Sequence, residues 1–124
     1  MAKRNLDRMR EILCFIEDDN DVHGRAILAG NAFFNAEDSY QIQLLQQAGF
    51  IQVGPISMGS GMPSWGSVTF EGHDYLDAIR DEGIWSKTKN AVAETGGSAS
   101  IEIVKALAVG FLKKKISQHT GMEL

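Results

Sequence analysis

The stretch that most constrains the fold is the run from Asn35 to Ile51, in which a helical pattern stops at a glycine and continues directly as a strand. Asn35 is a residue type that caps helices, and Asp38 stands three positions later, which is the spacing of a reciprocal N-terminal cap. Gly49 can supply the left-handed residue that ends many helices, and Phe50 can fold back onto the last turn. The stretch therefore predicts a capped helix that is followed by a β-strand.

The two faces of this helix differ in chemistry. The helical period places apolar or aromatic residues on one side, which we interpret as the core face: Tyr40, Leu44, Leu45 and Ala48. Gln41 falls among these positions, so we expect its amide to be hydrogen-bonded to backbone. The opposite face carries neutral polar side chains, namely Ser39, Gln43, Gln46 and Gln47.

A helix of this kind resembles the third helix of a winged-helix domain. In that arrangement its polar face would lie in the major groove of DNA, where Gln can pair bidentately with adenine. The simpler interpretation is that neutral amides on an exposed face contact only water. Both interpretations stay open, and the candidate DNA contacts are Ser39, Gln43, Gln46 and Gln47.

The distribution of charge argues against the usual docking of a winged helix on DNA. The chain has a formal net charge of −4, and none of its 12 Lys and Arg residues lies between Arg25 and Arg80. Because basic side chains on phosphates supply most non-specific affinity for DNA, we expect the usual docking mode to be disfavoured. Lys113, Lys114 and Lys115 stand near the C-terminus of the last helical pattern, where cations favour the helix dipole; a nucleic-acid-binding tail is the alternative.

The residues after Gly49 predict a β-hairpin. Residues 51–56 have a strand pattern, residues 58–66 have the composition of a loop, and residues 67–70 form a plausible return strand. The loop contains Met58, Met62 and Trp65, which are unusual on a hairpin that faces only water. Either Trp65 folds back onto the sheet, or the three side chains form an apolar contact patch for a protein partner.

The N-terminal region predicts one clear helix and one undivided segment. Apolar residues recur at helical spacing from Asn5 to about Asp18, and Cys14, the only cysteine, is expected to be buried there. Arg8 and its basic neighbours alternate with acids, which is typical of a solvated face with local ion pairs. The pattern in residues 22–34 is too weak to divide between a second helix and a short strand.

Three further helical patterns follow the hairpin. The first begins at its expected cap, Thr69, and a short amphipathic pattern covers residues 84–94. After a small-residue turn at residues 96–100, the last pattern runs from Ile101 to about Ser117 and is apolar around nearly its whole circumference. Such a helix must be covered on most sides, so we expect it to be wedged into the bundle or shared with a second subunit, preferably in a symmetric homodimer.

The sequence contains no recognisable catalytic or metal motif. His23, His73 and His119 lack the spacing of metal ligands, and the acidic run at residues 17–21 lacks the pattern of a calcium loop. We therefore expect no metal, no cofactor and no enzymatic activity. No apolar run reaches the ~18 residues of a membrane span, and the N-terminus lacks the apolar segment of a secretory signal, which predicts a cytoplasmic protein.

Several segments, spread over nearly the full chain, resemble an uncharacterised family of small bacterial and bacteriophage proteins, one of the domain-of-unknown-function families. The segments are residues 40–51, 68–81, 84–87, 96–98 and 104–108, and the most specific part is Thr69-Phe70-Glu71-Gly72-His73-Asp74-Tyr75-Leu76-Asp77. The resemblance implies a winged-helix-like fold and a phage or prophage setting. It implies no catalytic residue.

These patterns predict an α+β fold that is mainly α. We expect a winged-helix-like core of three helices and a β-hairpin wing over residues 1–82, with a C-terminal helical extension over residues 83–124 that packs on the core or forms a dimer interface. Two functions stay open. The preferred one is a winged-helix regulatory or adaptor protein of phage or prophage type, for which double-stranded DNA is a candidate partner, and the alternative is a protein-interaction module on the same scaffold that does not bind DNA.

Overall fold

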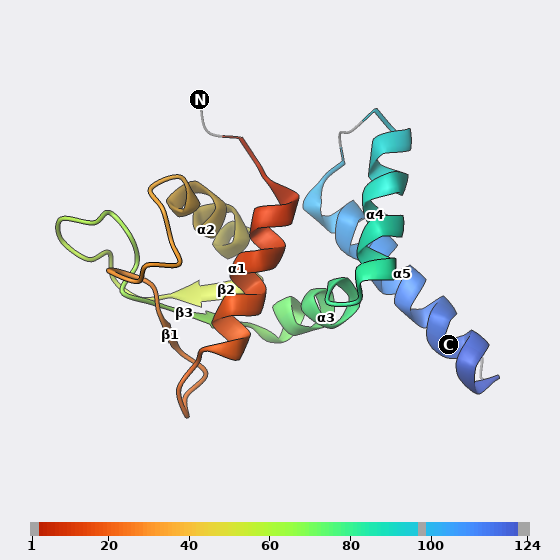
Figure 1. Cartoon of the computed structure of the whole chain (residues 1–124), viewed down its shortest axis with the longest axis horizontal. Helices are drawn as coiled ribbons and strands as arrows, with labels where there is room; N and C mark the ends of the chain where they lie inside the picture. The colour runs from red at the N-terminus through yellow and green to blue at the C-terminus, as the bar shows by residue number, and fades with distance from the viewer. Residues whose placement is uncertain (1–2, 97–98, 122–124) are drawn as a thin grey trace. The chain divides into compact units, whose positions relative to one another are not determined.

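The computed structural model describes residues 3–96 and 99–121, and the chain divides into two compact units, Met1–His73 and Asp74–Leu124. Its described residues form five α-helices and a small three-stranded antiparallel sheet (Figure 1), which confirms the predicted α+β, mainly α, fold class. The predicted domains, residues 1–82 and 83–124, stay a prediction. Residues 97 and 98, in the predicted turn before the last helix, lie outside the described residues.

The first unit combines helices with the sheet. Its elements are α1 (Leu6–Asp18), β1 (Ala26–Ile27), α2 (Asp38–Gln47), β2 (Ile51–Val53), β3 (Trp65–Val68) and the start of α3 (Phe70–Ile79). The sheet order is β1-β3-β2, with both pairs antiparallel. The predicted hairpin is therefore confirmed as β2 and β3, but β3 begins at Trp65, inside the predicted loop, and ends at Val68 because Phe70 already begins α3. β1 pairs with the other edge of β3.

Residues 22–34 contain β1 and turns, and no helix is present in this part of the described chain. The second helix that a winged-helix interpretation required here is not formed. Short polar side chains close the turns instead: the Asp21 carboxylate accepts the N–H of Arg25 at 3.1 Å, and the Asn31 amide donates to the carbonyl of Ile27 at 3.2 Å. Such local bonds compete with helical hydrogen bonds and favour turns.

The first predicted helix is confirmed as α1. Asn5 caps it by accepting the N–H of Arg8 at 3.0 Å, and its buried stripe is Met9, Ile12, Leu13 and Ile16. Cys14 lies beside this stripe and is only half-buried, so the expectation of a buried thiol is wrong.

The buried face of α2 is rotated from the predicted one. Its buried residues are Asp38, Gln41, Ile42 and Leu45, whereas Tyr40, Leu44 and Ala48 are half-buried. An apolar pattern alone did not identify this face, because two of its buried side chains are polar. Their partners belong to α1 and the segment before it, as described below.

The predicted end of α2 is confirmed. Gly49 has φ +80°, its N–H donates to the carbonyl of Gln46 at 3.0 Å, and the N–H of Phe50 donates to the carbonyl of Leu45 at 3.0 Å. These two bonds are those of a Schellman cap, which satisfies carbonyls at the helix end. Phe50 is buried, so the chain enters β2 directly from this cap.

The second unit contains the rest of α3, together with α4 (Glu82–Glu94) and α5 (Ile101–Thr120), which pack against each other. Asp81 caps α4 by accepting the N–H of Ile84 at 2.9 Å, and Ser100 caps α5 by accepting the N–H of Ile103 at 3.3 Å. The predicted helices are confirmed, and α5 continues beyond the expected Ser117.

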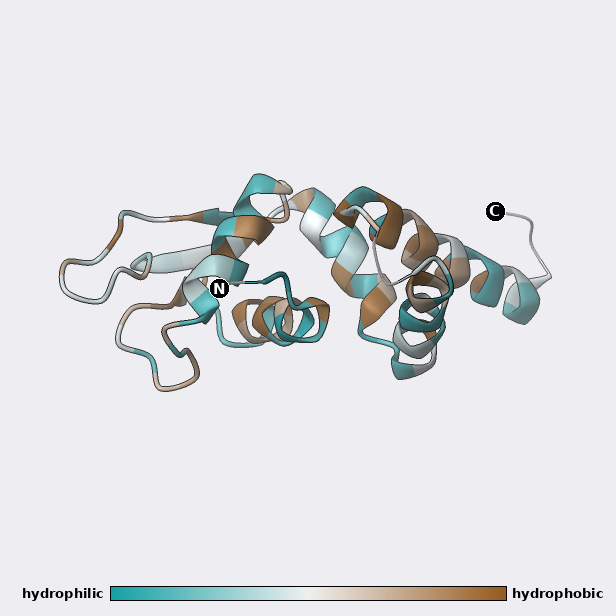
Figure 2. Ribbon diagram, turned by 90° about the horizontal axis from the view of Figure 1, so that it is seen from above, coloured by the Kyte–Doolittle hydropathy of each residue, from teal (hydrophilic) through white to brown (hydrophobic). Residues whose placement is uncertain are grey.

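The burial of α5 is less complete than its apolar circumference predicts. Val104 and Ala108 are its buried residues, while Ile103 is 54% exposed and Ile116 is 39% exposed. Figure 2 shows that the turns next to the C-terminus are hydrophilic. Across the described residues, no helix combines the length and the hydropathy that crossing a membrane would require.

Candidate functional site

A buried carboxylate joins α2 to α1. Arg8 donates from Nε to Oδ1 of Asp38 at 2.8 Å and from Nη2 to Oδ2 at 2.7 Å, and Asp38 is 1% exposed. The guanidinium also donates to the carbonyl of Phe33 at 2.7 Å and lies 4.4 Å from the centre of the Phe33 ring. A local ion pair with Glu11 forms as expected, but the prediction that Arg8 belongs to a solvated face is wrong.

The same carboxylate caps α2. Asp38 accepts the N–H of Asn35 at 2.9 Å, and the Asn35 side chain accepts the N–H of Asp38 at 3.2 Å, which confirms the reciprocal cap. The hydrogen bonds from Arg8 hold the pKa of Asp38 below its ordinary value, and the N–H of Asn35 adds to this effect. The bond to Asp38 in turn raises the pKa of Arg8.

Gln41 provides a second link between α2 and the N-terminal segment. Its Nε2 donates to the carbonyl of Lys3 at 2.7 Å, and its Oε1 accepts the N–H of Asn5 at 2.9 Å. The expectation that its amide bonds to backbone is confirmed. Because Asp38 and Gln41 both face inward, the opposite face of α2 is directed outward.

The outer face of α2 and the hairpin line a groove of about 350 Å³. The lining residues of α2 are Ser39, Tyr40, Ile42, Gln43 and Gln46, and those of the hairpin are Val53, Ile56, Gly61 and Pro63. Ile56 and Pro63 pair as an isolated bridge beyond the β2–β3 ladder, which brings the hairpin loop back on itself. None of these lining residues is charged.

The structure brings three of the four candidate DNA contacts to this groove. Ser39, Gln43 and Gln46 line it, and Gln47 is exposed on the same helix without lining it. The Ser39 hydroxyl donates to the carbonyl of Ala36 at 2.8 Å, whereas Gln43 and Gln46 are exposed. Their contact with DNA stays a prediction.

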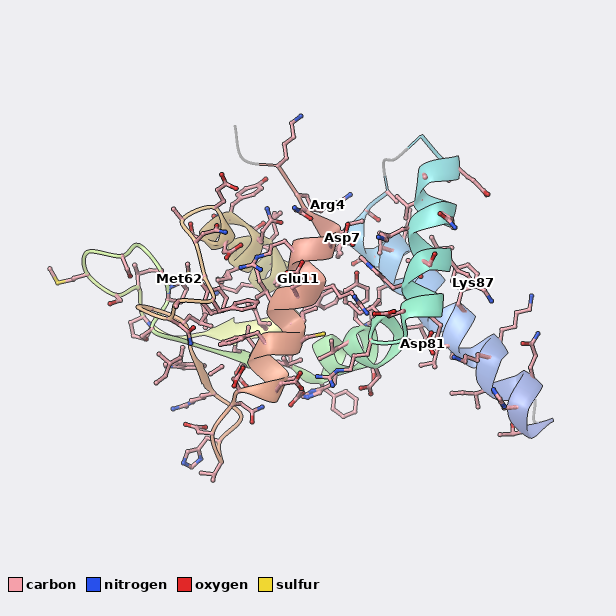
Figure 3. All side chains as sticks on the ribbon, viewed as in Figure 1. Arg4, Asp7, Glu11, Met62, Asp81 and Lys87 are labelled. Atoms are coloured by element: carbon pink, nitrogen blue, oxygen red, sulfur yellow. The ribbon has the colours of Figure 1, made fainter. Side chains whose placement is uncertain are left out.

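The three apolar residues predicted as partner contacts do not form one surface. Met58 is 99% exposed, but Met62 (Figure 3) is 6% exposed and belongs to the core. Trp65 is half-buried against Gly54, with the Arg25 guanidinium 4.4 Å from its ring centre, so it lies on the sheet. Ile56 is exposed and lines the groove, but the sequence did not identify it as a candidate contact residue. Its position in the strand pattern, next to the loop, could have indicated it.

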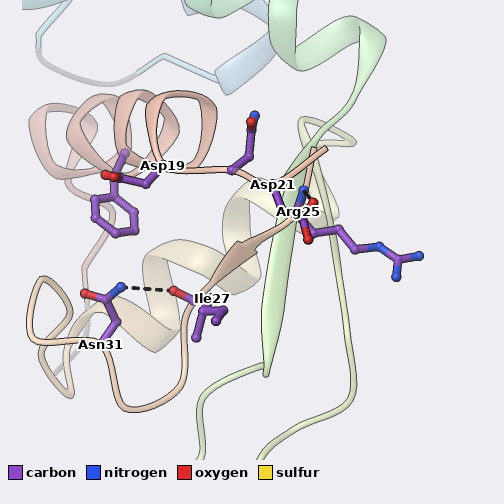
Figure 4. A pocket seen from close by; sticks show the side chains of 7 residues that line it. Asp19, Asp21, Arg25, Ile27 and Asn31 are labelled. Carbon is purple, nitrogen blue, oxygen red and sulfur yellow. Dashed lines mark hydrogen bonds between the residues drawn. The ribbon is translucent and has the colours of Figure 1, made fainter. Parts of the chain in front are cut away.

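A second pocket, of about 380 Å³, lies beside the end of α1 (Figure 4). Asp19, Asp21, Arg25 and Asn31 line it. The N–H of Arg25 and that of His23 donate to the Asp21 carboxylate and lower its pKa. This carboxylate is therefore already hydrogen-bonded within its own turn. Within residues 3–96 and 99–121, no group of three or more His, Cys, Asp or Glu side chains is placed to hold a metal ion.

His73 joins the start of α3 to α1. Its Nδ1 is 3.0 Å from the carbonyl of Thr69, and its Nε2 contacts the carboxylate of Glu17. Thr69 accepts the N–H of Gly72 at 3.1 Å and so is the predicted cap of α3. Both ring nitrogens of His73 therefore have a partner within the chain.

Comparison with known proteins identifies a relative and a family. A Haemophilus influenzae protein described as "Uncharacterized protein" is 29% identical over 117 residues, which covers 93% of this chain and 99% of that protein. No solved structure matches the chain. A family of hypothetical proteins, DUF2513, matches residues 3–98, and the chain belongs to this family.

Proposed function

We propose that this protein is a regulatory or adaptor protein that binds another protein in the groove between α2 and the hairpin. The observation that supports the proposal is the uncharged lining of that groove. Gln43 and Gln46 carry amide donors and acceptors that can pair with a peptide backbone. Tyr40, Val53 and Ile56 offer aromatic and apolar surface that a partner would remove from water. The proposal includes no catalytic activity.

The charge of the first unit supports a protein partner over DNA. Residues 1–73 contain five Lys and Arg against nine Asp and Glu, which gives a formal net charge of −4. Most of these five cations already have partners, because Arg8 is bonded to Asp38, Arg25 lies over the Trp65 ring, and Arg4 and Arg10 also have interactions within the chain. Few cations are left to contact phosphates, which normally contribute a large part of DNA affinity.

One observation favours DNA as a second candidate. A helix that runs into a hairpin, with an earlier strand paired to that hairpin, is part of the arrangement expected of a winged helix, although the second helix of that arrangement is not formed in residues 22–34. In this alternative α2 would enter the major groove and its polar side chains would contact base edges, namely Ser39, Gln43, Gln46 and Gln47. The phage or prophage setting implied by the family resemblance belongs to this proposal as well.

The experiment that separates the two candidates compares peptides and DNA on the same variants. Short random peptides would be selected on the purified protein, and mixed duplex DNA would be titrated by fluorescence anisotropy at low and then rising salt. We expect selected peptides to bind and to be lost in Ile56→Asp, while the control Glu102→Gln on α5 binds them normally. We also expect no duplex binding that depends on α2.

Two other results would contradict a protein partner in this groove. Duplex binding that weakens linearly in the logarithm of salt, and that falls when Gln43 and Gln46 are replaced by Ala, would support DNA reading by α2. Selected peptides that bind Ile56→Asp as well as the unchanged protein would overturn the proposed groove.

A further inference from the structure

The second unit has a groove of its own where α4 begins and α5 ends, with a volume of about 550 Å³. Lys87 lines it from α4, and Lys114 and Lys115 line it from α5. Asp81, labelled with Lys87 in Figure 3, also lines it, but its carboxylate is paired with Lys115 and accepts the N–H of Ile84 at 2.9 Å. The groove therefore has a surplus of positive charge.

Lys87 and Lys114 are the charges that a ligand could use. Both are exposed, and neither has a carboxylate partner in the part of the chain that the structure describes. Residues 74–124 contain seven Lys and Arg and seven Asp and Glu, so the unit as a whole is balanced. The positive charge of this groove is thus a local concentration, and a phosphate is the common biological anion that Lys side chains bind as point charges.

An aromatic and apolar wall accompanies the lysines. Phe111 lines the groove and is half-buried, and Ile84 lies behind it as a buried residue. A flat ring beside two cations suits a ligand that joins a base to a phosphate, since bases stack on aromatic side chains in a sequence-tolerant way. The volume also lies within the roughly 300–1,000 Å³ that is usual for small-molecule sites.

We propose that this groove binds a nucleotide, either free or as one unit of a nucleic-acid strand. Lys87 and Lys114 hold the phosphate, and Phe111 contacts the base. The site lies in the second unit and uses none of the residues of the α2 groove, so it does not depend on the function proposed above.

The test uses three probes and the full chain: a labelled single-stranded oligothymidylate, thymidine triphosphate and inorganic polyphosphate. Titrations are made at about 150 mM salt, where exposed charges are screened beyond roughly 8 Å. We expect the double variant Lys87→Gln, Lys114→Gln to bind the two thymidine-containing probes at least about tenfold more weakly. Lys113→Gln removes the same charge from the neighbouring position outside the groove, and we expect it to change affinity less than about twofold.

The base contact is tested by Phe111→Ala, with Phe111→Leu as a variant that keeps apolar volume if the first unfolds. Loss of the ring should weaken the thymidine-containing probes about fivefold or more, because stacking contributes about 1–3 kcal/mol per base, and should leave polyphosphate unchanged. Binding by the oligothymidylate alone would identify a strand, and binding by the triphosphate as well would identify the free nucleotide. Either result supports the site, provided that it depends on the three groove residues.

Three outcomes would overturn it. The first is no binding of any probe at millimolar concentration. The second is binding that the double lysine variant retains in full. The third is polyphosphate that binds as tightly as the oligothymidylate while Phe111→Leu has no effect, since that would show a general attraction of anions. Circular dichroism of each variant confirms that it is folded.

Discussion

The two units of the chain fix their helices by different means. In the first unit, buried polar side chains reach residues far away in the sequence, as Asp38 does with Arg8 and Gln41 does with the backbone of the N-terminal segment. In the second unit, Thr88 donates to the carbonyl of Ile84 at 2.8 Å, and comparable bonds close within single turns of the helices. A buried polar group needs its partner in one geometry, so we infer that α2 is held in a more closely specified orientation than α5.

This contrast also bears on the two proposed sites. The groove beside α2 depends on the direction of one helix, which Asp38 and Gln41 determine from the opposite face. The groove beside α4 depends on how α4 and α5 pack, and α5 buries only Val104 and Ala108 among its described residues. Substitutions inside the first unit should therefore affect stability more than comparable substitutions on α5.

The largest expected effect comes from Asp38→Ala. The variant leaves the partly buried Arg8 guanidinium without its bidentate partner and removes the cap of α2, so we expect a loss of about 3 kcal/mol in the free energy of unfolding. Urea unfolding measures this loss. The neighbouring Glu37→Ala is the control, because Glu37 is exposed and makes no side-chain cap bond. Equal losses in the two variants would contradict the role of the Asp38 carboxylate in holding α2 to α1.

A somewhat smaller effect is expected from Gly72→Ala. A Cβ at this position would lie 2.0 Å from the carbonyl oxygen of Phe50 and 2.9 Å from Val68 Cγ1, so the backbone would have to move, at a cost of about 2 kcal/mol. The matched control is Gly110→Ala in α5, where nothing lies within 4 Å of the added Cβ and a gain of up to about 1 kcal/mol is expected. Thermal unfolding of both variants would show opposite shifts, and shifts of the same sign would contradict the close approach of Gly72 to Phe50.

The sequence predicted the elements whose signals are local. The reciprocal cap at Asn35 and Asp38, the end of α2 at Gly49 and the cap of α3 at Thr69 each involve residues within one or two turns. Their chemistry can be read from spacing because the partners are neighbours in the chain. Gln41 differs, because its place among the core positions predicted that its amide would bond to backbone, but the partners, Lys3 and Asn5, are 38 and 36 positions away in the chain.

Contacts between distant residues were not predictable in this way. Arg8 stands beside acids that offered local pairs, and nothing in the sequence indicated that its main partner, Asp38, lies 30 positions away. The candidate groove, likewise, could be predicted only in part from the sequence. Its α2 side followed from one helix face, but its hairpin side includes Ile56 and Pro63, which meet in a bridge outside the regular ladder.

The link between α1 and α2 should also depend on pH. Hydrogen bonds from Arg8 lower the pKa of Asp38 in the folded chain, so its stabilising contribution is complete above the unfolded value of about 4 and is lost as the pH falls through the folded value. We expect the stability difference between the unchanged protein and Asp38→Asn to shrink below pH about 4. Urea midpoints measured from neutral to acid pH test this, with Glu37→Gln expected to run parallel to the unchanged protein. A difference that stays constant down to the most acid pH would contradict it.

The smallest expected effect on stability belongs to the exposed residues of α5, and it tests the homodimer that we propose through this helix. Ile103 and Ile116 stay exposed in the single chain, and a second copy of the helix is what we propose to cover them. Ile103→Glu with Ile116→Glu should change the unfolding free energy of the monomer by less than about 0.5 kcal/mol, while light scattering should show that it abolishes dimers formed by the unchanged protein. Glu102→Gln, on the same helix, should leave the dimer intact.

A protein that is monomeric at every concentration would rule out the proposed dimer. A loss of several kcal/mol in the monomer would show instead that α5 is packed as firmly as α2, and the contrast between the units would then fail.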